Sequence, residues 1–222
     1  MMEPTRIPLK GLRGMIAARM AESVNTTARA TLYSEADASA LVARRAAIKA
    51  KGSSISLEDL LLMCVTQTLT QHMALNGTLS DQVITLRPSV DLGIAIALPN
   101  GLVAPAIMGA QALSLEDLSA ARRDLVARAK TNKLTVAEMT GASFTVSNLG
   151  HYRIDHFTPL INIPQLAILG LGRIVNRPVV RADGALGVTP MIALSLSIDH
   201  RAIDGAPAAA FLTGLARAIE GM

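Results

Sequence analysis

One stretch near the C-terminus decides the fold: Met191-Ile192-Ala193-Leu194-Ser195-Leu196-Ser197-Ile198-Asp199-His200-Arg201-Ala202-Ile203-Asp204-Gly205. Residues 191–198 predict a strand, and a helix begins near Gly205 and runs almost to the end of the chain. A junction of this kind exposes side chains at the end of a sheet, where catalytic groups are often placed. His200 is therefore a candidate base, although a lone histidine in a loop is more often only a polar surface residue. Asp204 is also well placed as the N-cap of the final helix.

Upstream of that stretch, predicted helices and strands follow one another without regular alternation. Ser56 can cap an apolar helix that runs from Leu57 to about Leu75, and Ser114 begins another that reaches about Lys130. This order favours a mixed sheet with helices packed against it over a doubly wound parallel sheet. The predicted helices of this part of the chain cover residues 12–23, 38–51, 57–75 and 114–130. The predicted strands cover residues 29–37, 82–86, 89–98, 102–108 and 143–147. A turn is predicted at Pro99-Asn100-Gly101, and two further apolar runs cover Phe157–Ile161 and Gln165–Leu171.

The composition is unusually apolar, with 50% hydrophobic residues and a mean hydropathy of +0.39. Either a membrane span or a large contact between subunits would explain this excess. The uninterrupted apolar runs, such as Leu60–Val65 and Leu92–Leu98, are far shorter than the ~18 residues that a span needs. We therefore expect an oligomer and no membrane association. The chain does not open with a basic segment followed by an apolar one, so no export is expected either.

Other classes of protein are disfavoured by residue usage. Aromatic residues make up 2% of the chain, which argues against a nucleic-acid partner that stacks on aromatic side chains. The net charge of +4 fits ordinary solvated faces, and less well the attraction of a phosphate-bearing ligand. The lone Cys64 lies in an apolar helical run, so it is expected in the core and forms no internal disulfide framework. These features predict a cytoplasmic protein.

Competing catalytic and metal-binding motifs are weak or missing. The chain contains no GxSxG elbow, and no GxxxxGK phosphate-binding loop. Gly170 and Gly172 lack the third glycine of a dinucleotide fingerprint. His151 and His156 flank Asp155, but that spacing within a polar loop is a poor metal signal, and we predict no metal site.

Several motifs together resemble one known family. His200-Arg201-Ala202-Ile203-Asp204-Gly205 resembles the HRxxDG signature that chloramphenicol acetyltransferases share with the acyltransferase component of 2-oxoacid dehydrogenase complexes. Further segments resemble the dihydrolipoyl acyltransferase branch in particular, in the same order and over nearly the whole chain. These segments are Arg13–Met20, Asp91–Pro105, Ser143–Gly150, Phe157-Thr158-Pro159 and Ala167–Gly170.

The resemblance implies a fold and a reaction. The implied fold is the two-layer α/β sandwich of the chloramphenicol-acetyltransferase-like superfamily, as a homotrimer with active sites at subunit boundaries. The implied reaction passes an acyl group between the thiols of coenzyme A and a dihydrolipoyl group, with His200 as general base. By resemblance, the hydroxyl of Ser147 from a neighbouring subunit binds the oxyanion. The alternative for Ser147 is a strand-end serine that is bonded only to backbone.

Other site residues are implied less directly. In related enzymes the position of Asp204 orients the site through an arginine, for which Arg13 is the candidate, and a purely structural role is an alternative. Asn148 lies beside Ser147 and is assigned to shaping the turn. The sequence selects no residues for binding coenzyme A and does not name the acyl group.

The chain also departs from the family pattern. No lipoyl domain, subunit-binding domain or Ala/Pro-rich linker is recognisable, so residues 1–222 are interpreted as one acyltransferase domain, either an excised core or a free-standing enzyme. The lipoyl group would then be supplied in trans by a carrier domain on another chain or by free dihydrolipoamide, with other 2-oxoacid dehydrogenase complex subunits as possible partners. Because little follows the last predicted helix, we expect trimers that do not join into a larger cage. Two alternatives are a trimeric scaffold with little catalysis and an acyltransferase with another acceptor, such as an alcohol or a carrier-protein thiol.

Overall fold

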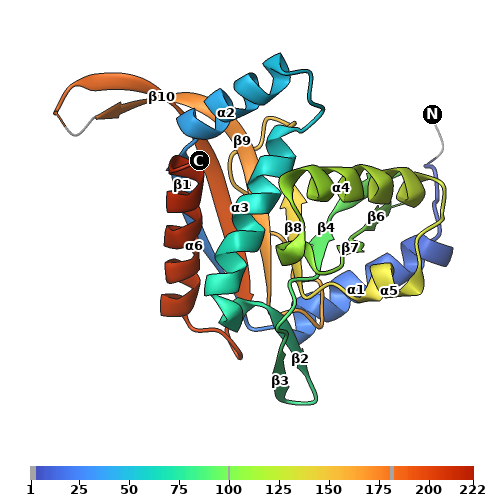
Figure 1. Cartoon of the computed structure of the whole chain (residues 1–222). Helices are drawn as coiled ribbons and strands as arrows, with labels where there is room; N and C mark the ends of the chain where they lie inside the picture. The colour runs from blue at the N-terminus through green and yellow to red at the C-terminus, as the bar shows by residue number, and fades with distance from the viewer. Residues whose placement is uncertain (1–3, 100, 181–182) are drawn as a thin grey trace.

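Strands and helices form two layers in the computed structural model, which describes residues 4–99, 101–180 and 183–222 (Figure 1). The strands of the main sheet, in order across it, are β1 (Arg29–Asp37), β10 (Leu186–Asp199), β9 (Ala167–Val180), β8 (Phe144–Asn148), β4 (Leu92–Ile94) and β7 (Ala106–Ile107). β8 runs parallel to both β4 and β9, and the other neighbouring pairs are antiparallel. The mixed sheet and the α/β sandwich are therefore as predicted.

The helices lie mainly on one face of this sheet. Figure 1 shows α2 (Ser39–Ala50), α3 (Leu57–Gln71) and α6 (Gly205–Glu220) covering that face, with α4 (Leu115–Lys130) beside α3. α1 (Gly11–Thr26) contacts β6 (Gly101–Val103) instead. The smaller elements are the hairpin of β2 (Gly77–Ser80) and β3 (Val83–Leu86), β5 (Ile96–Leu98) paired with β6, α5 (Val136–Thr140), and the 3-10 turns Met73–Leu75 and Ala110–Ala112.

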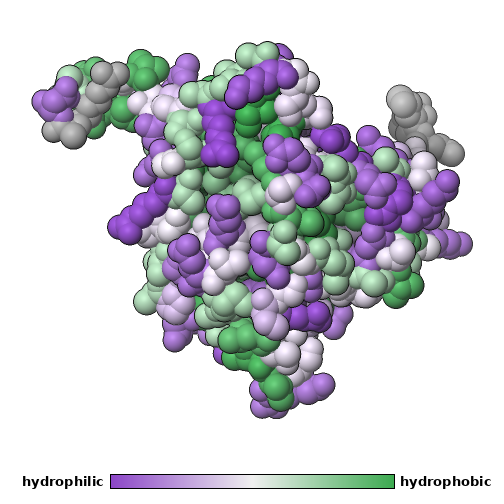
Figure 2. All heavy atoms as spheres, viewed as in Figure 1, coloured by the Kyte–Doolittle hydropathy of each residue, from purple (hydrophilic) through white to green (hydrophobic). Residues whose placement is uncertain are grey.

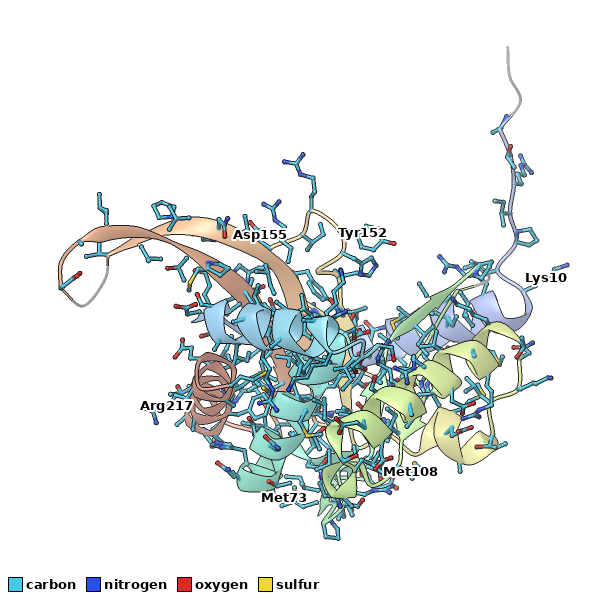
Figure 3. All side chains as sticks on the ribbon, turned by 45° about the horizontal axis from the view of Figure 1, so that its top comes forward. Lys10, Met73, Met108, Tyr152, Asp155 and Arg217 are labelled. Carbon is cyan, nitrogen blue, oxygen red and sulfur yellow. The ribbon has the colours of Figure 1, made fainter. Side chains whose placement is uncertain are left out.

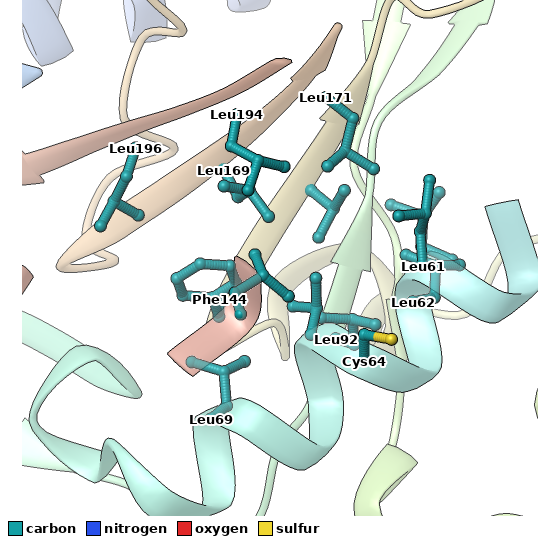
Figure 4. Packing of buried hydrophobic residues seen from close by; sticks show 14 of the residues in the cluster. Leu61, Leu62, Cys64, Leu69, Leu92, Phe144, Leu169, Leu171, Leu194 and Leu196 are labelled. Carbon is teal, nitrogen blue, oxygen red and sulfur yellow. The ribbon is translucent and has the colours of Figure 1, made fainter. Parts of the chain in front are cut away.

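The three central strands carry their large apolar side chains on the face that the helices cover. Phe144 of β8, Leu169 of β9 and Leu194 of β10 are fully buried there, because side chains alternate between the two faces of a strand (Figure 4). Leu62 and Leu69 of α3 pack into the same cluster. Each of these side chains contributes roughly 1.5–3 kcal/mol through burial, so the cluster is a main source of the fold's stability.

The opposite face of the same strands is lined with small residues, which lets the chain segment 149–165 pack directly on it. A Cβ atom at Gly170 would lie 2.7 Å from the ring of Phe157, and one at Gly172 would collide with the carbonyl group of Asp155. The two glycines are therefore required for packing, which explains a pattern that resembles part of a dinucleotide fingerprint.

Most predicted elements are confirmed with close boundaries. The strand 29–37 is β1, and the helices predicted at 12–23, 38–51 and 114–130 are α1, α2 and α4. The strand predicted at 191–198 ends at Asp199, and the final helix begins at Gly205 as predicted.

Other predicted boundaries are wrong. The helix from Leu57 ends at Gln71 and continues only as a 3-10 turn, and the strand predicted at 89–98 is divided at Ala95, whose N–H bonds the carbonyl group of Val146. The strand predicted at 102–108 is likewise split into β6 and β7. β2, α5 and the long outer parts of β9 and β10 were not predicted, because their polar or glycine-containing sequences lack a clear apolar period. The predicted turn at 99–101 includes Asn100, which lies outside the described residues.

The start of α3 is held by a predicted cap and by a buried ion pair. The Ser56 hydroxyl accepts the backbone N–H of Asp59 (3.2 Å), and the Asp59 carboxylate accepts that of Ser56 (2.7 Å), which forms a capping box. Burial alone would raise the pKa of Asp59, but hydrogen bonds from Arg122 of α4 and from Ser56 hold it below its usual value. Arg122 also pairs with Glu58 at 3.0 Å, so α4 is fixed to the beginning of α3.

Exposed apolar side chains gather on two protruding hairpins. Val180, Leu186 and Val188 lie on the arm formed by the outer ends of β9 and β10, and Val83 and Leu86 lie on the hairpin of β2 and β3 (Figure 2). Within the described ranges, no helix combines the length and the apolar character that crossing a bilayer requires.

Cys64 of α3 lies in the hydrophobic core, as predicted, and this burial determines the reactivity of its thiol. Burial raises the pKa of the thiol to about 11, so the unreactive neutral form prevails. We expect iodoacetamide at about pH 8 to leave the native protein unmodified and to alkylate it when guanidinium unfolds it, as measured by mass spectrometry. Equal alkylation rates for the native and the unfolded protein would contradict the burial of the Cys64 thiol.

The raised pKa of the Cys64 thiol also makes the stability of the fold depend on pH. The stabilisation is fully present below the ordinary thiol pKa of about 8.5 and is lost as the pH rises toward 11.

Candidate active site

His200 lies on a tight turn between β10 and α6. The N–H groups of Ala202 and Ile203 both donate to the carbonyl group of Asp199, at 2.9 and 3.0 Å, which closes the turn. The backbone N–H of His200 donates to the carbonyl group of Ala28 at 2.8 Å, so the position of its Cα atom is fixed. The imidazole itself is about half exposed, with 49% of its side-chain surface accessible. A fixed backbone with an accessible ring suits a base that must meet a substrate.

The carboxylate of Asp199 stabilises this turn through hydrogen bonds. Its buried carboxylate accepts hydrogen bonds from the backbone N–H groups of Ala28 (3.2 Å) and Arg201 (3.1 Å), and from the guanidinium group of Arg201. Burial alone would raise the pKa of Asp199, but the hydrogen bonds from Arg201 and Ala28 lower it overall. Sequence reasoning gave neither Asp199 nor Arg201 a role. The sequence does place an acidic and a basic residue on either side of His200, and this pattern could have indicated an ion pair that supports the turn.

Asp204 occupies the predicted N-cap position of α6, but its side chain makes no capping hydrogen bond. Its carboxylate lies instead near the ring of His200, with 3.7 Å between Oδ1 and Nδ1. This distance is too long for a hydrogen bond, so the effect of Asp204 on the ring is electrostatic. Within the described part of the chain, the exposed Arg13 forms no ion pair with Asp204. The orienting role of Arg13 stays a prediction.

Ser147 lies on the face of the sheet away from the helices, next to Gly170 in the parallel pair of β8 and β9. Thr145, two residues earlier on the same face, donates its hydroxyl proton to Oε1 of Gln165 at 2.7 Å. The hydroxyl of Ser147, in contrast, makes no hydrogen bond to any residue that the structure describes. The alternative of a serine bonded to backbone is therefore not observed, and this hydroxyl is free to bind a ligand.

Asn148 forms hydrogen bonds within and beyond the turn that follows β8. Its side-chain oxygen accepts the backbone N–H of Gly150 at 2.8 Å, and its amide nitrogen donates to Oε1 of Glu58 at 3.1 Å. Because Glu58 pairs with Arg122, the strand end that carries Ser147 is connected to both α3 and α4.

Ser147 and His200 lie far apart in one protomer. Ser147 pairs with Gly170, which pairs in turn with Ser195 of β10, and His200 comes five residues after Ser195. The separation is about 17 Å along the strand and about 10 Å across two strand spacings, or roughly 19 Å between Cα atoms. The two groups cannot act on one substrate atom unless a second chain brings them together.

Two cavities of different character border these groups. A cavity of about 490 Å³ contains Ser147 and is lined mainly by apolar side chains. A second cavity, of about 690 Å³, lies beside the turn of His200 and is polar, with Asp199 and Arg201 in its wall. Arg19 of α1 borders both cavities and donates a hydrogen bond to the carbonyl group of Ile163 at 2.9 Å.

The segment 149–165 contributes charged contacts near the long hairpin of β9 and β10. Asp155 lies at the base of the β9–β10 arm (Figure 3), where its hydrogen bond with Arg173 lowers its pKa, and Arg177 pairs with it as well. Nε2 of His156 lies 3.6 Å from a carboxylate oxygen of Glu35. Among the described residues, no three His, Cys, Asp or Glu side chains are grouped so that they could hold a metal ion.

The fold and the family follow from comparison with known proteins. The architecture is that of chloramphenicol acetyltransferase, with a TM-score of 0.61 at 16% identity over 91% of this chain and 94% of that one. Residues 2–222 match the family described as 2-oxoacid dehydrogenases acyltransferase (catalytic domain). The chain belongs to this family, as its motifs predicted.

The names of the curated relatives specify the transfer of different acyl groups. The acetyltransferase component of the acetoin cleaving system of Bacillus subtilis is 36% identical over 219 residues, which cover 96% of this chain and 55% of that protein. The mitochondrial succinyltransferase component of the 2-oxoglutarate dehydrogenase complex of Saccharomyces cerevisiae is 37% identical over 221 residues, which cover 97% and 48%. The chain thus spans about half the length of the curated relatives it matches.

Two solved structures agree closely with this one. The Azotobacter vinelandii dihydrolipoamide acetyltransferase, studied for the roles of a serine, a histidine and an asparagine in its catalytic mechanism, has a TM-score of 0.93 at 32% identity. The cubic core of a pyruvate dehydrogenase multienzyme complex also has a TM-score of 0.93, at 33% identity. Each alignment covers 98% of this chain and 92% of the other.

Removing the charge of Asp199 should loosen the turn of His200. We expect Asp199→Asn to lower the free energy of unfolding by about 2 kcal/mol at neutral pH, because charged hydrogen bonds to buried groups are lost. Since the pKa of Asp199 is lowered in the folded state, this advantage of the wild type is present above about pH 4 and is lost as the pH falls through the lowered pKa. Urea unfolding at several pH values measures it, with the exposed Asp183→Asn as the control. Equal stability of the two variants would contradict the role of Asp199.

Proposed function

We propose that this chain transfers an acyl group between the thiol of coenzyme A and a dihydrolipoyl thiol. The observation that carries the proposal is the pair of incomplete half-sites in one protomer: an accessible imidazole on a locked turn, and a serine hydroxyl without a hydrogen bond to the described residues. The strand register places their Cα atoms roughly 19 Å apart. Family membership supports it, as does the study of a serine and a histidine in the mechanism of the Azotobacter relative. In that protein the asparagine comes four residues after the histidine, as Asp204 follows His200 here.

The proposal includes a homotrimer in which His200 of one chain faces Ser147 of the next. A cyclic trimer repeats the same contact at every interface, so each interface joins one half-site of each kind. The exposed apolar arm and the high mean hydropathy of +0.39 agree with extensive contact between chains. The cubic core among the similar structures supports assembly of this kind, and the sequence-based expectation that trimers stop there stays a prediction.

In the proposed mechanism His200 removes the proton from the attacking thiol. A free thiol has a pKa of about 8.5 and a free imidazole of about 6.5, so complete transfer is uphill by roughly 2.7 kcal/mol, and deprotonation is best coupled to attack. Asp204 faces Nδ1 of the ring and favours the tautomer that carries its proton there, which leaves Nε2 to accept the thiol proton.

The sulfur then adds to the carbonyl carbon of the thioester and forms a tetrahedral intermediate with a negative oxygen. The hydroxyl of Ser147, which has no partner within the described residues of its own chain, donates to that oxygen. One such donor contributes roughly 2.7–4 kcal/mol to the transition state. As the bond between carbon and the departing sulfur breaks, the imidazolium returns its proton to the leaving thiolate. Because the thiol proton returns to a thiol and one thioester replaces another, the step needs no further reactant.

The lipoyl group is proposed to be carried on a lysine side chain of a carrier domain, within a 2-oxoacid dehydrogenase complex in the cytoplasm. The names of the curated relatives, which are dihydrolipoyllysine-residue acyltransferase components, support a lipoyl-lysine substrate, and the lone, buried Cys64 agrees with the location. A scaffold without catalysis is disfavoured by the two free catalytic groups. An acceptor other than the lipoyl thiol would show as turnover with an alcohol or a carrier-protein thiol in an acceptor screen.

Substitution of the two half-site residues should have different kinetic consequences. We expect His200→Ala to lower kcat by roughly 100-fold or more, because general-base catalysis is lost. Ser147→Ala should lower kcat by roughly 100-fold while the KM for coenzyme A changes little, because the hydroxyl acts on the transition state. Turnover of acetyl-CoA, propionyl-CoA and branched acyl-CoA with dihydrolipoamide measures both. An active His200→Ala enzyme would exclude the proposed base.

A site shared between chains should be restored by mixing the two inactive variants. In a random mixture of His200→Ala and Ser147→Ala chains, about a quarter of the interfaces join a wild-type histidine to a wild-type serine. We therefore expect co-expressed variants to regain about a quarter of wild-type activity, which far exceeds the activity of either variant alone. Light scattering on the same sample tests whether the mass is that of a trimer or of a cage. Activity no higher than the sum of the two single variants would contradict a shared site.

A further inference from the structure

We infer that the apolar cavity beside Ser147 accepts the carbon chain of an uncharged aliphatic acyl group and rejects an acyl group that ends in a carboxylate. The inference rests on the proposed function, because it concerns the acyl group that the same site transfers. Curated relatives include both acetyl- and succinyltransferases, so family membership leaves this choice open. The side chains around Ser147 decide between the two classes.

The position of the cavity places it next to the reacting carbonyl group. Ser147 lies in its wall, so an oxyanion held by this hydroxyl puts the attached acyl chain at or inside the cavity. The ring of Phe157 packs on Gly170, the cross-strand neighbour of Ser147, and forms the adjacent wall. Ile168, on the same face of β9, continues the floor.

The rest of the lining is also mainly apolar. α1 contributes aliphatic and thioether side chains, and the segments around β6 and Pro159 add further aliphatic surface. The apolar side chains of these segments include Leu12, Met15, Met20, Leu102, Val103 and Leu160. A volume of about 490 Å³ is far more than a two-carbon acyl group fills, so branched aliphatic chains fit as well.

The polar groups of the lining offer little to a carboxylate. Thr145 already donates its hydroxyl proton to Gln165, and Asn162 is uncharged. Arg19 is the charged member of the described lining, and its guanidinium group donates to the carbonyl group of Ile163 at the border with the polar cavity. A carboxylate inside the apolar cavity would lose hydration without gaining a buried cation from the described residues of the same chain, which is unfavourable.

The test compares kcat/KM for acetyl-, isobutyryl-, isovaleryl- and succinyl-CoA with dihydrolipoamide on the purified full chain. We expect the best uncharged donor to exceed succinyl-CoA by roughly 100-fold or more. Succinyl-CoA within about tenfold of the best uncharged donor would overturn the inference and leave the proposed function intact. If none of the four donors is turned over, the proposed function fails and the inference fails with it.

A matched pair of variants tests the location of the acyl chain. Met20→Lys places a cation in the wall of the cavity, whereas Met73→Lys adds the same charge on a 3-10 turn that lines neither cavity (Figure 3). We expect Met20→Lys to raise the ratio of succinyl to acetyl transfer by roughly tenfold or more, and Met73→Lys to leave this ratio unchanged. Equal ratios in the two variants would show that the acyl chain lies elsewhere. The wild-type comparison of donors stands even if Met20→Lys does not fold.

A third variant tests the role of Arg19. Arg19→Gln removes the charge at the border between the cavities and keeps a hydrogen-bond donor for Ile163. If the cavity rejects carboxylates, both donors should respond alike and the ratio of succinyl to acetyl transfer should not change. A selective loss of succinyl transfer of roughly tenfold would identify Arg19 as a carboxylate receptor and overturn the inference.

Discussion

The alternation of side chains along β8, β9 and β10 is the constraint on which the rest of the structure depends. One face carries Phe144, Leu169 and Leu194, which bury against the helices and stabilise the fold. Apart from Ile168, the other face carries mainly glycine, serine and threonine, which leave room for the segment 149–165 and for the apolar cavity. Because the period of a strand is two residues, the same pattern that builds the core also places Ser147 on the face that borders the apolar cavity.

The site is divided between two regions that are each rigid for a different reason. The turn of His200 is held by the buried carboxylate of Asp199, which gathers backbone and guanidinium donors around one negative charge. The strand end of Ser147 is held through Asn148, Glu58 and Arg122, which connect β8 to α3 and α4. Both local structures are already formed within one chain, and the proposed assembly would bring them together.

Much of the fold and of the site could be predicted from particular residues. Ser56 marked the start of α3, the period-two run 191–198 marked the core of β10, and the motif from His200 to Gly205 indicated the family. The same motif names His200 as the candidate base. The outer halves of β9 and β10 were missed, because their stability depends on pairing with each other rather than on an apolar period of their own. Asp199 was missed for a similar reason, since its partner Ala28 is distant in sequence and becomes a neighbour only through the sheet.

The sequence by itself determined the α/β class and the family, and it singled out His200 and Ser147 as candidate site residues, because these depend on local periodicity and on short motifs. Only the tertiary structure decided that the two residues lie far apart in one chain, because the strand register places their Cα atoms roughly 19 Å from each other. It also decided that Asp204 faces the imidazole and does not cap α6, and that aliphatic side chains from distant segments surround Ser147. Both depend on side-chain directions and long-range packing, which one-dimensional patterns do not encode.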